Sequence, residues 1–178
     1  CFLLEDVGFD LYGQSWEDWE KKARLEIPYA NALQAGQILY SRNQSCTQRF
    51  ETLRKKLRLV LEGPFTRQLA EYAGRELSAA YEALGRLCLE TRLGQARMDA
   101  CQIFFSCSDA LCRINRHPWQ YGTRRRRVEI ASMEAVPADF LPVAREMVES
   151  HSIEGLLAAS RRVRSGARGL RSACLARL

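Results

Sequence analysis

The residues best suited to chemistry lie in one stripe within residues 95–122, QARMDACQIFFSCSDALCRINRHPWQYG. Its polar positions alternate steps of three and four, which places them on one face of a helix with a period of 3.6 residues. They are Asp99, Gln102, Ser106, Asp109, Arg113 and Arg116. Asp109 precedes Arg113 by four residues, the order that favours an ion pair. Two interpretations stay open: the wall of a substrate cleft, or a solvated seam on an otherwise buried helix.

A second set of residues follows at once and is suited to binding phosphate or nucleic acid. It comprises Asn115, Arg116, Tyr121 and the run Arg124, Arg125, Arg126 and Arg127. The planar guanidinium group matches phosphate with two hydrogen bonds. Four positive charges in a first helical turn also oppose the helix dipole, so an acid or a bound anion should compensate them. The alternative is a solvated basic turn that binds nothing.

The rest of this stretch is apolar around most of the helix, which is typical of the central helix of a bundle. We expect the side that carries Cys101, Phe104, Phe105 and Cys112 to be buried. His117 and Pro118 end the helix, and we expect Trp119 to pack into the turn that follows rather than to stack on a base.

Composition limits the classes of protein. The 178 residues suit one domain, or one domain and a small piece, and the net charge of +6 permits a polyanionic partner. No apolar run approaches the roughly 18 residues that a membrane span needs, so no membrane contact is expected. The seven cysteines include no C-x-x-C pair, which predicts free thiols and a cytoplasmic location. The chain begins with Cys1, which suggests a piece of a longer protein.

Hydrophobic periodicity predicts a mainly α protein: an up-and-down bundle of about five helices preceded by a small strand-containing piece. We expect extended structure over residues 2–12, with strand-like alternation at residues 9–12, and a short strand over residues 36–41. The expected helices follow Ser15, Asn43, Pro64, Gly94, Thr123 and Ser152, with a further helix over residues 144–150, and Gly94 is expected to break the chain between two of them. The expected units are residues 1–42, a helical bundle over residues 43–163, and a frayed basic tail over residues 164–178.

Three stretches, taken in order, resemble bacterial nucleotidyltransferases of the kanamycin-nucleotidyltransferase type. GFDLYGQSWEDWEKKA is similar to the last sheet strand and its helix, and LQAGQILYSRNQSCTQRFETLRKKL to the linking segment. ALCRINRHPWQYGTRRRRVEIASMEAVPADF is similar to the helical C-terminal domain. That domain is related to the bundles called HEPN. The resemblance implies the strand-containing piece of a nucleotidyltransferase sheet followed by a substrate-binding bundle.

The resemblance also implies a Mg²⁺ site, because nucleotidyl transfer needs carboxylates that hold the metal against the triphosphate. Asp10 matches the third carboxylate of the family and is the expected catalytic and metal residue, with Glu5 and Asp6 as alternatives. The family's Gly-Ser turn and Asp-x-Asp strand are absent, and Ser41 stands where an Asp is usual. HEPN-type ribonucleases have more residues between their Arg and His than lie between Arg113 and His117, so this spacing does not favour ribonuclease activity.

Two functions remain open on these grounds. The first is the helical substrate-binding portion of a nucleotidyltransferase-like enzyme, which transfers a nucleotidyl group from an NTP to a small or macromolecular acceptor and is inactive without an upstream segment. The second is a non-catalytic helical binding or regulatory module, associated with nucleic acid. The sequence leaves the acceptor and the oligomeric state open.

Overall fold

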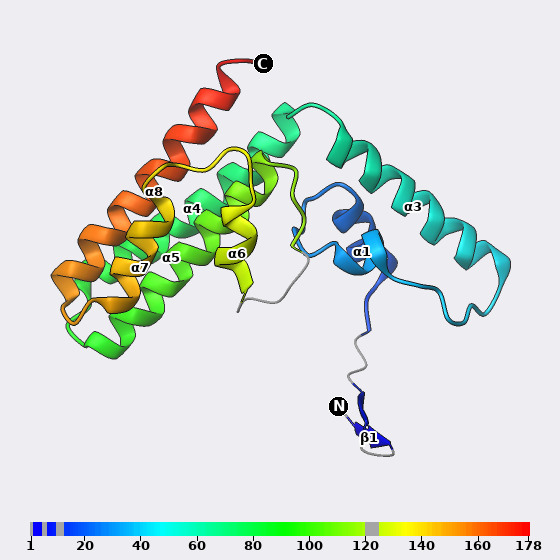
Figure 1. Cartoon of the computed structure of the whole chain (residues 1–178), viewed down its shortest axis with the longest axis horizontal. Helices are drawn as coiled ribbons and strands as arrows, with labels where there is room; N and C mark the ends of the chain where they lie inside the picture. Colours follow the sequence, from blue (N-terminus) through cyan, green and yellow to red (C-terminus); the bar gives the residue numbers. More distant parts are fainter. Residues whose placement is uncertain (1, 5–6, 10–12, 120–124) are drawn as a thin grey trace.

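The computed structural model of the chain describes residues 2–4, 7–9, 13–119 and 125–178. The described part is mainly helical, as predicted, and its strands are two short ones. Strand β1 (Phe2–Leu4) pairs antiparallel with β2 (Val7–Phe9), and Phe2 lies opposite Phe9. This hairpin projects from the body of the molecule (Figure 1). Both strands lie within the extended segment expected over residues 2–12, of which residues 5, 6 and 10–12 lie outside the described part.

The strand expected over residues 36–41 does not form. Residues 36–41 have no regular secondary structure and pair with no strand in the described part of the chain. Leu39 is 93% exposed and Tyr40 86% exposed. A strand requires a neighbour that accepts its backbone hydrogen bonds, and the β-favouring residue types of this segment do not supply one. The prediction was wrong for that reason.

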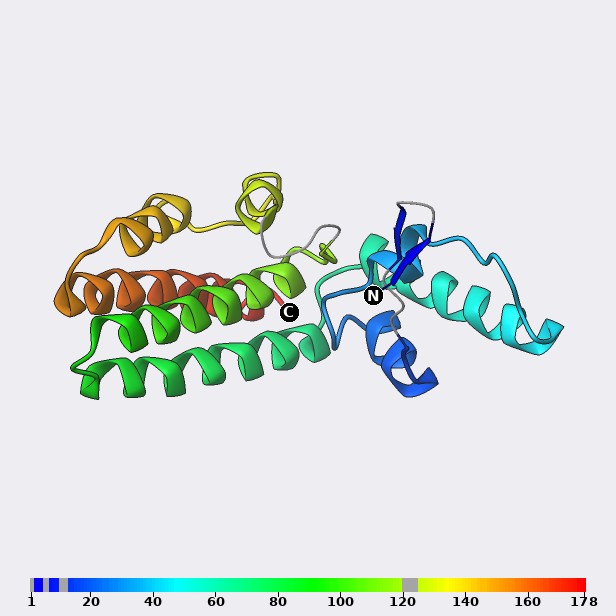
Figure 2. The same ribbon diagram turned by 90° about the horizontal axis from the view of Figure 1, so that it is seen from below.

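The first three helices form a unit of their own. Helices α1 (Trp16–Ala23) and α2 (Asn31–Ala35) pack against α3 (Gln44–Glu62). Ser15 and Asn43 cap α1 and α3 by accepting the amides of Asp18 and Cys46. The helix α3 was expected in the bundle, but its apolar face meets α1 and α2 instead. It points away from the bundle in both views (Figures 1 and 2).

Three long helices make the bundle. They are α4 (Arg67–Leu89), α5 (Leu93–Ile114) and α8 (Ile153–Leu175), and each packs against the other two. The short helices α6 (Arg126–Ala131) and α7 (Phe140–Glu149) lie on one side of this layer (Figure 2). Helix α4 ends at Leu89 rather than at Gly94, because the Glu90 carboxylate accepts the amides of Thr91 and Arg92 and forms the turn there.

The C-terminal segment is part of the bundle and not a frayed tail. Helix α8 continues from Ser152, its cap, to Leu175 and so passes the expected end near Val163. Ala167 is fully buried, and the Arg171 Nε donates to the carbonyl of Ala70 on α4 at 2.7 Å. Packing of small residues between α4 and α8 keeps this basic stretch helical, which its composition alone did not indicate.

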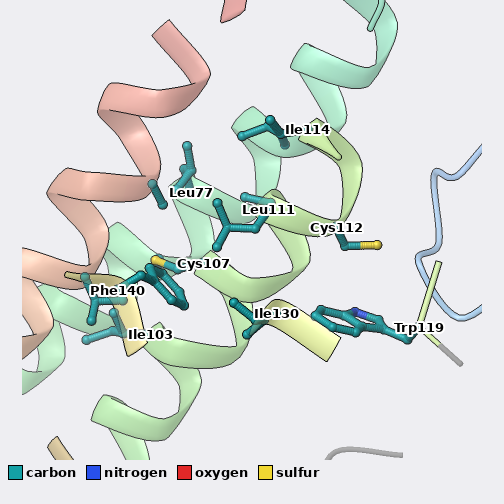
Figure 3. Close-up of a cluster of buried hydrophobic side chains, with 14 of the residues drawn as sticks. Leu77, Ile103, Cys107, Leu111, Cys112, Ile114, Trp119, Ile130 and Phe140 are labelled. Carbon is teal, nitrogen blue, oxygen red and sulfur yellow. The ribbon is translucent and has the colours of Figure 1, made fainter. Parts of the chain in front are cut away.

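The core gathers along α5. Ile103, Cys107 and Leu111 are fully buried there and pack with Phe140 of α7 and Leu77 of α4 (Figure 3). All six described cysteines are free, as predicted; they are Cys46, Cys88, Cys101, Cys107, Cys112 and Cys174. None of the helices in the described part is both long and apolar enough to span a membrane.

The expected buried side of α5 is only partly correct. Cys112 is buried, whereas Cys101 is exposed and Phe104 and Phe105 are half-buried. The apolar surface of α5 is wider than its neighbours cover, and the uncovered part faces a cavity described below.

Candidate functional site

The first residues of the predicted polar stripe on α5 contact other side chains of the protein. Asp99 is buried and accepts a hydrogen bond at 2.9 Å from Nε of Arg86 on α4, with which it forms an ion pair. The exposed Gln102 donates to the buried hydroxyl of Ser106 at 3.1 Å. Asp99 therefore ties two helices together, and its carboxylate does not face a cleft.

Arg113 lies deep inside the molecule, with 2% of its surface exposed. Its Nη1 donates to the backbone carbonyl of Asp109 at 2.8 Å, and its Nη2 donates to the carbonyl of Glu26 at 2.7 Å. Its carboxylate partner is Glu76 of α4, at 2.9 Å from Nη2. The expected Asp109–Arg113 side-chain pair is therefore wrong, because Glu76 approaches Arg113 from a neighbouring helix.

The Asp109 carboxylate faces two donors from the chain beyond α5. Its Oδ1 accepts a hydrogen bond from Nε1 of Trp119 at 2.7 Å and lies 2.9 Å from Nη1 of Arg126. Trp119 is buried, as expected of a residue that packs into the turn. Together these contacts fasten the segment after α5 and the start of α6 back onto α5.

Of the described members of the predicted arginine run, Arg126 is buried, with 2% of its surface exposed. Its guanidinium carbon lies 4.7 Å from the ring centre of Phe105, 4.8 Å from that of Trp119 and 5.4 Å from that of Tyr29. These distances are those of cation–π contacts, which are stronger when water is excluded. Burial makes Arg126 unavailable to phosphate, so that part of the prediction was wrong, whereas Arg125 and Arg127 are exposed.

Burial also shifts the acid–base behaviour of this pair. Burial raises the pKa of the Asp109 carboxyl to about 7; the hydrogen bond from Trp119 acts in the opposite direction. Burial lowers the pKa of Arg126 to about 10, against the attraction of Glu129. Arg126 stays positive at neutral pH, and Asp109 is the group that titrates near it.

Asn115 and Arg116, expected to bind substrate, end helix α5. The side-chain Nδ2 of Asn115 donates to the carbonyls of Leu111 and Ala135, and its Oδ1 accepts a hydrogen bond from the backbone amide of Ala135. Arg116 adopts a φ of 52°. Its backbone amide donates to the carbonyl of Arg113, and the backbone amide of His117 donates to the carbonyl of Cys112. This is the paired-bond pattern that closes many helices, with an arginine at the place usually taken by glycine.

The remaining predicted residues lie outside the described part: Asp10, Glu5, Asp6, Tyr121 and Arg124. The described residues contain no cluster of three His, Cys, Asp or Glu side chains that fits a metal ion. The acids that were predicted on α5 are engaged with arginines instead. A Mg²⁺ site therefore stays a prediction that rests on Asp10.

A cavity of about 400 Å³ lies over the uncovered side of α5. Four helices line it. Helix α5 contributes Arg97, Ala100, Cys101, Phe104 and Phe105, α6 contributes Arg126 and Arg127, α7 contributes Ala144, Met147 and Val148, and α8 contributes Leu156. The three arginines are the polar members. Phe104 also packs on Phe140, with ring centres 5.9 Å apart. The volume is within the range of small-molecule sites, which are mostly apolar with a few placed polar groups.

The residues that α7, α8 and the start of α5 contribute were not predicted from the sequence. Phe104 and Phe105 were assigned to the core, since a cavity-lining aromatic has the same spacing as a core aromatic. Val148 carried no distinct signal, because it follows the buried Ala144 by four residues and so continues the core face of α7.

Comparisons with protein-family models, with curated proteins and with solved structures found no match to this chain.

Proposed function

We propose that the helical part of this chain is a binding module that takes a small ligand with an apolar body in the cavity over α5. The observation that carries the proposal is the combination of a cavity of about 400 Å³ with two half-buried phenylalanines, Phe104 and Phe105, in its lining. The predicted acceptor-binding residues favour no alternative cleft, since Asp99, Asp109 and Arg113 are engaged in ion pairs.

Elementary energetics support an apolar occupant. Removing apolar surface from water gains roughly 25 cal/mol per Å², so covering Phe104, Phe105 and Val148 would favour binding. The cavity lies between helices that are fixed elsewhere: α5 by its core residues and α7 by Phe140 and Val143, both fully buried. Such a site needs little rearrangement, which lowers the cost of binding.

Cys101 offers a direct test, because it lines the cavity and is exposed. Alkylation by iodoacetamide would be followed residue by residue by mass spectrometry, with and without octanol as a neutral apolar probe. We expect octanol to slow modification of Cys101 severalfold in a saturable way. Cys88 is the matched control, since it is exposed on α4 outside the cavity lining.

A cavity-filling variant sharpens the test. Ala144→Met places a larger side chain in the cavity and should abolish protection of Cys101 without loss of helical content. If octanol protects Cys101 and Cys88 equally, or protects Cys101 equally well in Ala144→Met, the cavity is not the binding site and the proposal is wrong.

The nucleotidyltransferase activity implied by the resemblance is a second proposal. The feature that favours it is the order of elements, in which a short β-hairpin precedes the helices. In this case the cavity would hold the apolar part of the acceptor, and nucleotide and Mg²⁺ would be held elsewhere, with Asp10 as a ligand. Labelled ATP, Mg²⁺ and candidate acceptors, offered to the chain with and without an upstream segment, test it. Nucleotidyl transfer that requires the upstream segment and is lost in Asp10→Asn would support this second proposal. If no transfer occurs with the segment present, the binding module remains the proposed function.

A further inference from the structure

We propose that the ligand of the cavity over α5 is an amphipathic anion, with an apolar body against Phe104 and Met147 and a carboxylate or similar group held by Arg127. This inference rests on the proposed binding function and names the chemical class of its ligand.

The charge of the lining carries the first step. The polar residues that line the cavity are Arg97, Arg126 and Arg127, and no acid is among the described lining residues. An apolar cavity with only cations at its polar positions disfavours a cationic ligand by repulsion. It favours a negative group that can lie at the boundary between the apolar wall and water.

The second step is which arginine is available. Arg126 is already paired with Asp109 at 2.9 Å and is enclosed by aromatic rings. Arg97 donates to the carbonyl of Ser150 at 3.2 Å and approaches Nδ1 of His151 at 3.5 Å. Arg127 is exposed and has no ion pair or side-chain hydrogen bond to any other described residue. Its full set of forked donors can therefore meet a carboxylate.

The third step is the length of the site. Arg97 and Phe105 are eight residues apart on α5, which corresponds to ~12 Å along the helix axis. Arg126 contacts Phe105, so its neighbour Arg127 lies toward that end of the cavity. A ligand with its negative group at Arg127 can extend its apolar body past Phe104 and Ala100 toward Arg97. A medium-length alkyl chain matches this span.

The experiment compares octanoate with octanol by calorimetric titration of the full chain at low salt. We expect octanoate to bind about tenfold more tightly than octanol, as for one charge-assisted hydrogen-bonded contact. Added salt should reduce that preference, because the mouth of the site is exposed. Equal affinities of the two probes would overturn the anion assignment and leave the proposed function intact, whereas failure of both to bind would overturn both.

Three variants locate the anion. Arg127→Gln should weaken octanoate binding about tenfold and weaken octanol binding much less, because only octanoate carries the charge that Arg127 meets. Arg97→Gln should have a smaller effect on octanoate. Arg67→Gln is the charge-matched control, because Arg67 is exposed on α4 outside the lining and should leave both affinities unchanged. An equal loss of octanoate affinity in Arg127→Gln and Arg67→Gln would mean that only net charge matters and would overturn the proposal, as would a larger loss in Arg97→Gln than in Arg127→Gln.

Discussion

Nη1 of Arg126 lies 2.9 Å from Oδ1 of Asp109, in an ion pair whose two side chains are 3% and 16% exposed. The pair divides a run of arginines that is uniform in sequence. Arg126 turns inward to Asp109, whereas Arg125 and Arg127 remain at the surface. The run therefore combines a buried structural residue, Arg126, with two residues at the surface.

Arg126→Leu tests the structural role. Removing one partner of a buried ion pair leaves an uncompensated charge, and we expect a loss of roughly 3–5 kcal/mol in the free energy of unfolding at pH 8. The loss should be smaller at pH 5, where a protonated Asp109 needs no cation. Urea unfolding at both pH values measures it. Arg127→Leu is the neighbouring control and should change stability by about 0.5 kcal/mol or less; equal effects of the two variants would contradict the assignment.

The raised pKa of Asp109 predicts a pH dependence of stability. A carboxyl group with a pKa of about 7 in the folded chain and an ordinary value near 3.9 when unfolded holds its proton more tightly when folded. Its contribution is therefore complete below about pH 4 and is lost as the pH rises to about 7, with a span on the order of 4 kcal/mol. Asp109→Asn should flatten the stability curve in this window, whereas Asp139→Asn, at an exposed carboxylate, should not. An unchanged slope in Asp109→Asn would show that another group dominates.

Arg116→Gly separates a structural from a ligand-binding role at the end of α5. Arg116 has a φ of 52°, and the left-handed region costs a residue with a Cβ atom roughly 1 kcal/mol or more. Glycine adopts this conformation without that cost, so we expect the variant to be as stable as the parent or more stable by up to about 1 kcal/mol. Thermal unfolding measures the change. Loss of octanol or octanoate binding in a stable Arg116→Gly protein would indicate that the predicted substrate-binding role was correct after all.

The thiols should react in two groups. Burial raises the pKa of Cys107 to about 12 and raises that of Cys112 well above its ordinary value, so neither forms a reactive thiolate at pH 8. Cys88 and Cys101 are exposed and should react first with a disulfide reagent. Unfolding under non-reducing conditions should release all seven thiols of the sequence. Rapid modification of Cys112 in the folded chain, or a count below seven, would contradict this.

The sequence predicted local structure better than packing. Helices were expected to follow Ser15 and Ser152, and both hydroxyls cap those helices by accepting the backbone amides of Asp18 and Gly155. Cap signals are local, so one stretch of sequence contains all that they need. Two predictions were wrong because the structure there depends on a partner distant in sequence. The strand expected over residues 36–41 has no neighbouring strand to pair with, and α8 extends beyond its expected end because it packs against α4.

The candidate site was harder to predict for a related reason. The alternation of three and four correctly placed Asp99, Asp109 and Arg113 on α5, but spacing does not tell which elements come to face them. Glu76 and Arg126 approach from other helices and convert the stripe into ion pairs. The cavity lies between α5, α6, α7 and α8 beside the half-buried Phe104 and Phe105. The sequence of α5 alone does not show how closely the other helices pack against it.

The contact between the first unit and the bundle has a consequence for how the chain can vary. Arg113 donates to the carbonyl of Glu26 at 2.7 Å, and the Trp119 amide donates to the carbonyl of Pro28 at 2.9 Å. Both acceptors belong to the backbone, which every amino acid provides. On the bundle side only the first of these bonds needs a particular side chain, that of Arg113, because the second is donated by a backbone amide. Substitutions at positions 26–28 that preserve the path of the main chain leave both bonds in place, so the two bonds constrain Arg113 more than they constrain those positions.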